Sequence, residues 1–323
     1  GSSSGFGRTA SGEARFHTPE DVLAHVREQP AVGEQIQQFD PDRAYEEIRS
    51  AFEAGLAKAG DDRLWLPWAL HKSVTFHSRL TTFGYEGFLG ALALYADEME
   101  TLFAADGVIG RMWNEVLVRV FEDNGWEKVV WHGQDICGNS GPMTSPDLLH
   151  SIFMPHLKIA YEPLVEAEFR IVWHSDGNIK PLRDDLLDAG VGGFQGMQEY
   201  MDNPDWNNPL EELAQMTDLQ GRPLLIFGSI SCRQTLPFGS AEDVRTAAQR
   251  CLDLSAQRGG GLIMLTDNTV GPDVPTDNLF TLYEYAPGVT AQRHPKEDGV
   301  ARQGRTPPAP IRQPPLTHAR HSP

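Results

Sequence analysis

The chain has 323 residues, of which 40% are hydrophobic and 22% charged, and its formal net charge is −18. These values are typical of a globular protein, and the length allows one large domain or two smaller ones. Because an acidic surface repels phosphate backbones, a nucleic-acid partner is not expected. The three cysteines contain no CxxC pair, which argues against a disulfide framework. No apolar run reaches the roughly 20 residues that span a bilayer, and no signal-peptide pattern is present, so we predict a cytoplasmic protein with no membrane partner.

The two ends of the chain differ in composition from the middle. Residues 1–14 begin Gly-Ser-Ser-Ser-Gly without periodicity, so we expect a flexible lead-in. Residues 287–323 hold 8 prolines, six Lys/Arg and two acids. Such a segment buries too little apolar surface to offset its ordering entropy, which predicts a disordered Pro-rich basic tail, with a basic interaction arm as the alternative. Residues 15–286 are predicted to form the folded domain.

Between these ends, short apolar segments alternate with longer amphipathic ones, as in βα units. In chain order we predict a strand over 63–70, helices over 85–105 and 107–124, a strand over 128–132, a helix over 146–168, a strand over 169–173, a helix over 182–189, a strand over 191–195, a helix over 209–217, a strand over 223–228, a helix over 241–256, a strand over 261–265 and a helix over 277–285. Continuous apolar strands separated by helices predict an α/β fold whose parallel sheet is covered on both faces. Because no GxGxxG follows an early strand, we favour a TIM (β/α)8-type barrel over an open doubly wound sheet.

Polar side chains follow these predicted strands, where the active site of a βα barrel lies. The candidates are Asp135, Cys137, His174, Asp176, Asn178, Gln195, Ser229, Cys232 and Asp267. Each aspartate alone could be a turn or a helix cap, and each cysteine could be a small buried residue. His71 and His77 also follow a strand and could line the mouth, although packing is the more common role for such histidines. The convergence of several polar groups on one edge is therefore the stronger signal.

His174 and Asp176 form the sharpest pair. Because side-chain direction alternates along a strand, an H-x-D sequence at a strand end points both groups the same way. An imidazole and a carboxylate placed in this way can share a divalent metal or act as an acid/base pair. A metal site needs a third ligand from another strand. The candidates for that ligand are Cys137, Cys232, Asp267 and Asp135.

Six segments carry a family resemblance. They are DICGNSGPMTSP (135–146), HSDGNI (174–179), LLDAGVGGFQ (186–195), LPFGSAEDV (236–244), GGGLIMLTDN (259–268) and DVPTDNL (273–279). Their order and spacing resemble the uroporphyrinogen decarboxylase superfamily of TIM barrels over roughly residues 17–286. That superfamily includes tetrapyrrole decarboxylases and the corrinoid-dependent methyltransferases that act with methylamines, methanol or methoxy-aromatics. The resemblance therefore implies an enzyme with a small-molecule substrate.

The chain departs from the family pattern at informative places. Decarboxylases of the superfamily have an arginine-bearing N-terminal motif, and nothing like it is present here. The zinc methyltransferases have a His-x-Cys after one strand and a further cysteine near the last strand. His174 matches that histidine, whereas Asp176 replaces the first cysteine and 266–268 contains none. Carboxylate ligands shift preference toward harder metals. Because only about six strands can be counted, the barrel is expected to be incomplete at its N-terminus.

The favoured hypothesis is a methyltransferase or demethylase that passes a methyl group between a small substrate and a corrinoid (cobalamin) on a partner protein. His174, Asp176 and Asp135 would be catalytic or would hold a divalent metal, with zinc the first choice. The expected substrate-binding residues are Gln195, Asp267, Asn178 and Ser229. The alternatives are a uroporphyrinogen decarboxylase-type carboxy-lyase of porphyrin biosynthesis, which needs no cofactor, another metal-assisted lyase or hydrolase on the same barrel, and a truncated, inactive barrel. The resemblance to the decarboxylases also suggests a homodimer.

Overall fold

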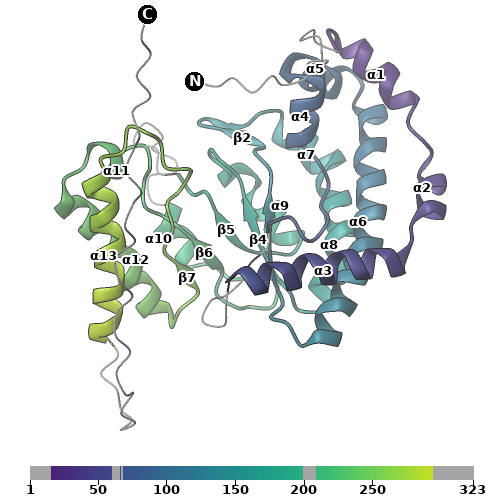
Figure 1. Ribbon diagram of the computed structural model, residues 1–323. Coiled ribbons are helices and arrows are strands. Elements are labelled where there is room, and N and C mark those ends of the chain that lie inside the picture. Colours follow the sequence, from purple (N-terminus) through teal and green to yellow (C-terminus); the bar gives the residue numbers. More distant parts are fainter. Residues whose placement is uncertain (1–15, 60–65, 67, 199–208, 294–323) are drawn as a thin grey trace, which may run out of the picture.

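The computed structural model describes residues 16–59, 66, 68–198 and 209–293, and it has an α/β fold built on one parallel sheet (Figure 1). The five strands lie in the order β1 (Val129–Gly133), β4 (Arg170–His174), β5 (Val191–Gln195), β6 (Leu225–Phe227) and β7 (Leu262–Ile263). All four neighbouring pairs are parallel. The parallel sheet predicted from the apolar segments is therefore confirmed, within one or two residues at most strand ends. Closure into an eight-stranded barrel stays a prediction.

Half of the first predicted strand, residues 63–65 and 67, lies outside the described residues. Of that segment, Trp68 forms an isolated parallel bridge to Trp131, which extends the sheet beyond β1. The lead-in over 1–14 and most of the predicted tail also lie outside the described residues. Helix α13 (Thr276–Arg293) continues past residue 286, where we expected the folded domain to end. None of the helices that the structure describes combines the length and apolar character needed to cross a membrane.

Two helix boundaries were predicted wrongly. Helices α5 (Tyr85–Leu94) and α6 (Ala96–Asn124) meet at Tyr95, so α6 runs straight through the break expected near residue 106. Gly107 is there for close packing: a Cβ at this position would lie 2.8 Å from the carbonyl oxygen of His156 on α8. The helix predicted over 146–168 is divided at Phe153 into α7 (Pro146–Ile152) and α8 (Met154–Glu166). Pro155 lies in the first turn of α8, where its missing N–H is tolerated.

Four helices precede α5, and the sequence analysis did not anticipate them. They are α1 (Pro19–Arg27), α2 (Val32–Gln38), α3 (Pro41–Ala59) and α4 (His77–Phe83). Helix α1 begins with a capping box between Thr18 and Asp21 and packs on α5, while α3 packs on α6. A short hairpin of β2 (Cys137–Gly138) and β3 (Gly141–Pro142) follows β1.

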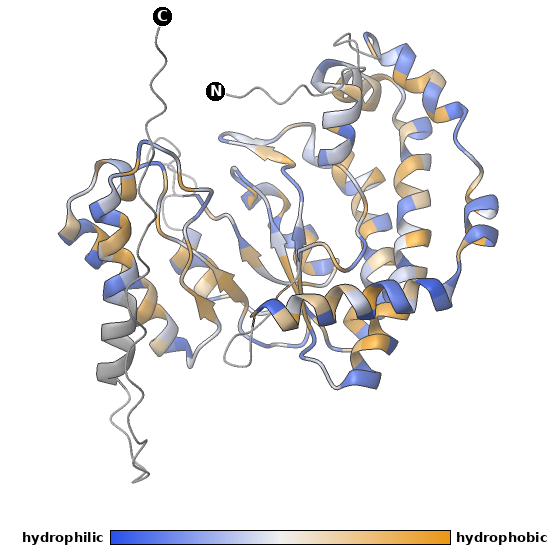
Figure 2. Ribbon diagram, viewed as in Figure 1, coloured by the Kyte–Doolittle hydropathy of each residue, from blue (hydrophilic) through white to orange (hydrophobic). Residues whose placement is uncertain are grey.

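The later helices are the 3-10 turn η1 (Lys180–Leu182), α9 (Arg183–Asp188), α10 (Pro209–Ala214), α11 (Thr235–Phe238) and α12 (Ala241–Arg258). Among them, α9, α10 and α12 follow the predicted order, whereas η1 and α11 were not predicted. Helix α12 begins, like α1, with a capping box, here between Ser240 and Asp243. Figure 1 shows α6 and α8 on one side of the sheet and α12 and α13 on the other. Hydrophobic residues gather along the strands, and hydrophilic residues are frequent on the peripheral helices α1 and α2 (Figure 2). The core includes Trp173, Phe194 and Ile226, none of which is exposed.

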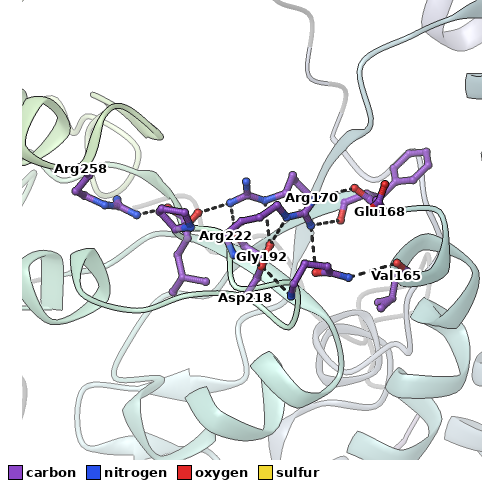
Figure 3. A network of polar contacts seen from close by, with 11 residues as sticks. Val165, Glu168, Arg170, Gly192, Asp218, Arg222 and Arg258 are labelled. Atoms are coloured by element: carbon purple, nitrogen blue, oxygen red, sulfur yellow. Dashed lines mark hydrogen bonds and ion pairs between the residues drawn. The ribbon is translucent and has the colours of Figure 1, made fainter.

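A cluster of arginines holds the N-terminal ends of the strands together around one buried carboxylate (Figure 3). Asp218, whose side chain is 2% exposed, pairs with Arg222 Nε at 2.8 Å and lies 3.4 Å from Arg170 Nε. Arg170 donates to the carbonyl oxygens of Gly192 and Pro223, and Arg258 donates to that of Leu224. The guanidinium groups thus satisfy backbone carbonyls of neighbouring strands at the edge opposite the predicted site.

Replacement of Asp218 by asparagine should destabilise the fold by about 3 kcal/mol, because two largely buried arginines lose their counter-charge. Chemical unfolding followed by circular dichroism measures this free energy. Asp184→Asn is the matched control, since Asp184 also pairs with an arginine, Arg183, but is 82% exposed. A loss for Asp218→Asn no larger than for Asp184→Asn would show that the cluster does not hold the strands together.

Candidate functional site

Three of the predicted residues converge at the C-terminal edge of the sheet. Asp135 follows β1, His174 ends β4, and Asp176 lies two residues beyond His174. One ligand atom from each lies within 4.8 Å of the other two. His174 Nε2 is 3.4 Å from Asp135 Oδ1 and 3.9 Å from Asp176 Oδ1. Both carboxylates therefore approach the same imidazole nitrogen.

The pairing of β1 with β4 brings these groups together. Gly133 lies opposite His174 in the register of the two strands, and the N–H of Gln134 donates to the carbonyl oxygen of His174 at 2.8 Å. A Cβ at Gly133 would overlap the backbone of His174, so this close approach requires glycine. Beyond the strands, the N–H of Asp176 donates to Asp135 Oδ1 at 3.1 Å. Backbone contacts thus hold the two aspartates on either side of the imidazole.

Gln195 determines which nitrogen of His174 faces the carboxylates. Gln195 Oε1, at the end of β5, lies within hydrogen-bond distance of His174 Nδ1. Because an amide oxygen only accepts, Nδ1 carries the hydrogen and Nε2 is directed at Asp135 and Asp176. Gln195 was predicted as a substrate-binding residue. The structure places it against the imidazole, in the position of a residue that orients His174.

Asp176 has its own amide partners. Asn268 Nδ2 donates to Asp176 Oδ2 at 2.8 Å, and Gln198 Nε2 donates to Oδ1 at 3.3 Å. Asn268 follows β7, so strands from both halves of the sheet contribute to this edge. The carboxylate is oriented by side chains that carry no charge of their own.

The charges of the three groups shift their pKa values. Burial lowers the pKa of His174, but the hydrogen bond and charge of Asp135, together with the charge of Asp176, outweigh burial and raise it above its ordinary value. The contact with His174 lowers the pKa of Asp135. Burial, reinforced by the charge of Asp135, raises the pKa of Asp176. With two carboxylates on one side and an imidazole on the other, the site has a strong demand for a positive charge.

A cavity of about 460 Å³ opens beside this group. Its described lining includes Asp176, Cys137, Cys232, Arg233, Asn268 and Asp273. Asp176 therefore belongs both to the three-residue group and to the cavity wall. A small molecule in the cavity would have direct access to the carboxylate end of the group.

Three other predicted substrate-binding residues make internal contacts. Asn178 Oδ1 accepts from the N–H of Lys180 at 3.0 Å, which is an Asx-turn. The Ser229 hydroxyl donates to the carbonyl oxygen of Met197 at 2.7 Å. Asp267 is 1% exposed, and its Oδ1 accepts from the N–H of Cys232 at 2.8 Å. Their binding of substrate stays a prediction.

The third donor beside His174 and Asp176 is Asp135, rather than Cys137, Cys232 or Asp267, in the group that the described residues form. Burial raises the pKa of Cys137 to about 12 and also raises that of Cys232. Both cysteines are therefore thiols at neutral pH. The Cys232 thiol donates to the carbonyl oxygen of Asn268 at 3.1 Å.

The two histidines that follow the first predicted strand have different surroundings. His71 is 1% exposed and lies among His132 and Tyr161, so it is a packing residue. His77 Nδ1 lies 3.6 Å from Asp135 Oδ2, at the edge of the three-residue group. Sequence reasoning gave His77 little weight and missed Gln198. No motif signals either residue, because their neighbours in space are distant in the sequence.

The three-residue group can hold either a proton or a metal ion. The His174 Nε2 lone pair and the two carboxylates face one another, and three electron-pair donors lie so close only if a positive charge is shared among them. One imidazole nitrogen and two carboxylate oxygens suit zinc and harder divalent ions. The amide partners of His174 and Asp176 are of the kind that orient metal ligands. The residues present therefore fit a divalent metal.

One family model matches part of this chain. Residues 130–288 match the family model described as uroporphyrinogen decarboxylase (URO-D). Over these residues the chain is similar to that family, as the resemblance in its motifs implied, and the matched segment contains all three residues of the group. Curated proteins give no match.

Among solved structures, a methyltransferase from Methanosarcina mazei is similar to this chain with a TM-score of 0.47 and 16% identity. The alignment covers 76% of this chain and 64% of that one, so this chain spans less than two thirds of the methyltransferase's length. A similarity of this size carries no information on activity.

In the metal-free protein, His174 should titrate above its ordinary pKa of 6.5. NMR observation of its ring protons measures this pKa, and Asp135→Asn should lower the pKa of His174 because a neighbouring negative charge is lost.

The same shift makes the stability of the fold depend on pH. Because the pKa of His174 is higher in the folded than in the unfolded chain, the resulting stabilisation is complete below the pKa of the unfolded chain and is lost as pH rises through the pKa of the folded chain. The cost of Asp135→Asn in unfolding free energy should thus be larger at about pH 5.5 than at about pH 8.5. Equal costs at both values would contradict this coupling.

Proposed function

We propose that this protein is a metal-dependent methyltransferase of the superfamily, which transfers a methyl group between a small substrate and a corrinoid carried by a partner protein. The observation that supports it is the group of Asp135, His174 and Asp176 at the cavity edge. His174 and Asp176 occupy the positions of the His-x-Cys that the resemblance assigns to the zinc site of the methyltransferases. The altered second position keeps an anionic ligand and exchanges sulfur for oxygen.

Asp135, His174 and Asp176 would hold the metal, with zinc the first choice. A divalent ion bound there supplies Lewis acidity, which polarises a substrate heteroatom and lowers its pKa. Two carboxylates and one neutral imidazole carry two negative charges, which balance a divalent cation. Gln195 keeps the hydrogen of His174 on Nδ1, so that Nε2 presents its lone pair. These are the contributions that the chain itself makes to the site.

The cavity then positions the substrate. Asp176 lies at its wall, so a substrate there lies beside the three-residue group. Asn268 donates to Asp176 and lines the same cavity, and this contact orients the carboxylate. The corrinoid would supply the methyl-carrying cobalt, and the role of the protein is to bind and orient the two reactants.

A tetrapyrrole carboxy-lyase is less well supported by the same cavity. A polyanionic substrate needs several cationic groups facing it. Arg233 is the one lysine or arginine among the described lining residues, and Asp176 and Asp273 line the same space. The arginine cluster around Asp218 lies at the opposite edge of the sheet. The described part of the cavity therefore favours a substrate with little negative charge.

The purified protein should bind one zinc ion per chain, and His174→Ala or Asp135→Asn should abolish stoichiometric binding, because two donors cannot replace three. Elemental analysis after dialysis measures the content. His150→Ala is the matched control, since His150 forms a similar His–Asp pair with Asp185 at 2.8 Å but is 70% exposed. Metal content that survives in both site variants would exclude this group as the metal site.

Methyl transfer should depend on added cob(I)alamin or a corrinoid protein, with methylamines, methanol and methoxy-aromatics as first substrates to test. His174→Ala should reduce the rate by about 100-fold or more, the loss typical when a metal's surroundings are disrupted, and His150→Ala should leave it unchanged. Formation of methylcobalamin is followed by absorbance. Release of carbon dioxide from a carboxylated tetrapyrrole, with no requirement for cobalamin, would instead identify a carboxy-lyase.

A further inference from the structure

A histidine that the proposed function does not use lies beside Asp135. His77 is the first residue of α4, and its Nδ1 lies 3.6 Å from Asp135 Oδ2. This nitrogen is buried and has no hydrogen-bond partner among the described residues, although 39% of the His77 side chain is exposed. The buried edge of the ring is thus turned toward the carboxylate, and Asp135 is the acidic group that faces it.

The two oxygens of Asp135 have different surroundings. Oδ1 accepts from the N–H of Asp176 at 3.1 Å and lies 3.4 Å from His174 Nε2, so it belongs to the shared centre of the group. Oδ2 is directed away from that centre and toward His77. The separation of 3.6 Å is within ion-pair distance and about 0.4 Å beyond the longest ordinary N–H···O hydrogen bond.

Asp135 is the one member of the three-residue group that forms no hydrogen bond with a side-chain amide among the described residues. Gln195 orients His174, and Asn268 and Gln198 orient Asp176. Metal ligands in proteins are generally oriented by such outer partners, because a ligand that rotates freely binds more weakly. His77 is placed to orient Asp135, as the side-chain amides orient His174 and Asp176.

Gln134, the residue before Asp135, determines where His77 lies. Its side-chain oxygen accepts from the backbone N–H groups of Phe76 and His77, the latter at 3.0 Å, and its amide nitrogen donates to the carbonyl oxygen of Val74. Gln134 is only 4% exposed, so these contacts are protected from water. Gln134 therefore holds the start of α4 against the end of β1. This contact places His77 beside Asp135, the residue that follows Gln134.

We infer that His77 is a positioning residue for Asp135: its Nδ1 lies at ion-pair distance from Oδ2, and this contact holds Oδ1 toward His174 and the backbone of Asp176. The inference rests on the proposed metal-binding role of this group. His77 is not itself a member of the set of donors that lie within 4.8 Å of one another. His77 acts through Asp135. It limits the rotation of the carboxylate before an ion binds, so that less conformational freedom is lost on binding.

Metal affinity of the full chain tests this role. Zinc binding is measured by competition with a chromophoric chelator, and cobalt(II) substitution gives an absorption spectrum that reports ligand geometry. His77→Ala should weaken zinc binding by about 10–100-fold and alter the cobalt(II) spectrum. His77→Asn should retain both properties near the wild-type level, because the asparagine amide nitrogen can occupy the place of Nδ1. His150→Ala serves as the control that removes an exposed histidine.

The outcomes separate the inference from the proposed function. If the wild-type protein binds zinc and His174→Ala loses it, while His77→Ala binds as the wild type does, the role of His77 is refuted and the metal site stands. Equal weakening in His77→Asn and His77→Ala would also refute it, since the donor would then be irrelevant. If the wild-type protein binds no zinc, both proposals fail. If His77→Ala does not fold, His77→Gln is used in its place. The glutamine amide lies one bond further from the backbone than that of asparagine, so His77→Gln should still show weakened zinc binding.

Discussion

The candidate site of this protein depends on the approach of two carboxylates to one imidazole nitrogen. Asp135 and Asp176 come from the ends of adjacent strands, and His174 lies between them because β1 and β4 pair in register with Gly133 opposite His174. Any side chain at Gly133 would separate the two strands, because its Cβ would overlap the backbone of His174. Like charges held this close repel unless a positive charge lies among them, so the site is built around a cation or a proton.

The surroundings of the group explain how such an unfavourable arrangement is kept in place. Neutral amides contact His174 and Asp176, and they orient these ligands without adding further charge. Backbone N–H groups bridge the strand ends and direct Asp135 toward the imidazole. Because amide partners have little entropy to lose when already packed, a cation entering the site meets donors whose orientation is largely set.

The two edges of the sheet have opposite electrostatic character. Arg170, Arg222 and Arg258 gather at the N-terminal ends of the strands, where they bind carbonyl oxygens around Asp218 (Figure 3). Carboxylates gather at the C-terminal ends. In βα folds the first edge serves stability and the second serves chemistry. The separation keeps arginines out of the described cavity wall except for Arg233, which is why a cation-binding site is favoured over a site for polyanions.

Local sequence determined much of the fold and part of the site. Apolar runs predicted five strands to within one or two residues at most ends, the capping box at Ser240 marked the start of α12, and the H-x-D pattern identified His174 and Asp176. These signals are local, since strand periodicity and capping act over a few residues. The break predicted near residue 106 was wrong because Gly107 permits close packing inside a continuous helix, and the single helix predicted over 146–168 was wrong because Pro155 starts a new helix.

Only the tertiary structure decided which residues complete the site. It placed Asp135, out of four candidates, beside His174 and Asp176, placed Gln195 against the imidazole, and brought His77 to the second oxygen of Asp135. His77 and Asp135 are separated by 58 residues in the chain, and their contact depends on the side-chain amide of Gln134. No periodicity or spacing encodes such a contact, because it arises from the pairing of strands and the packing of helices rather than from neighbouring residues.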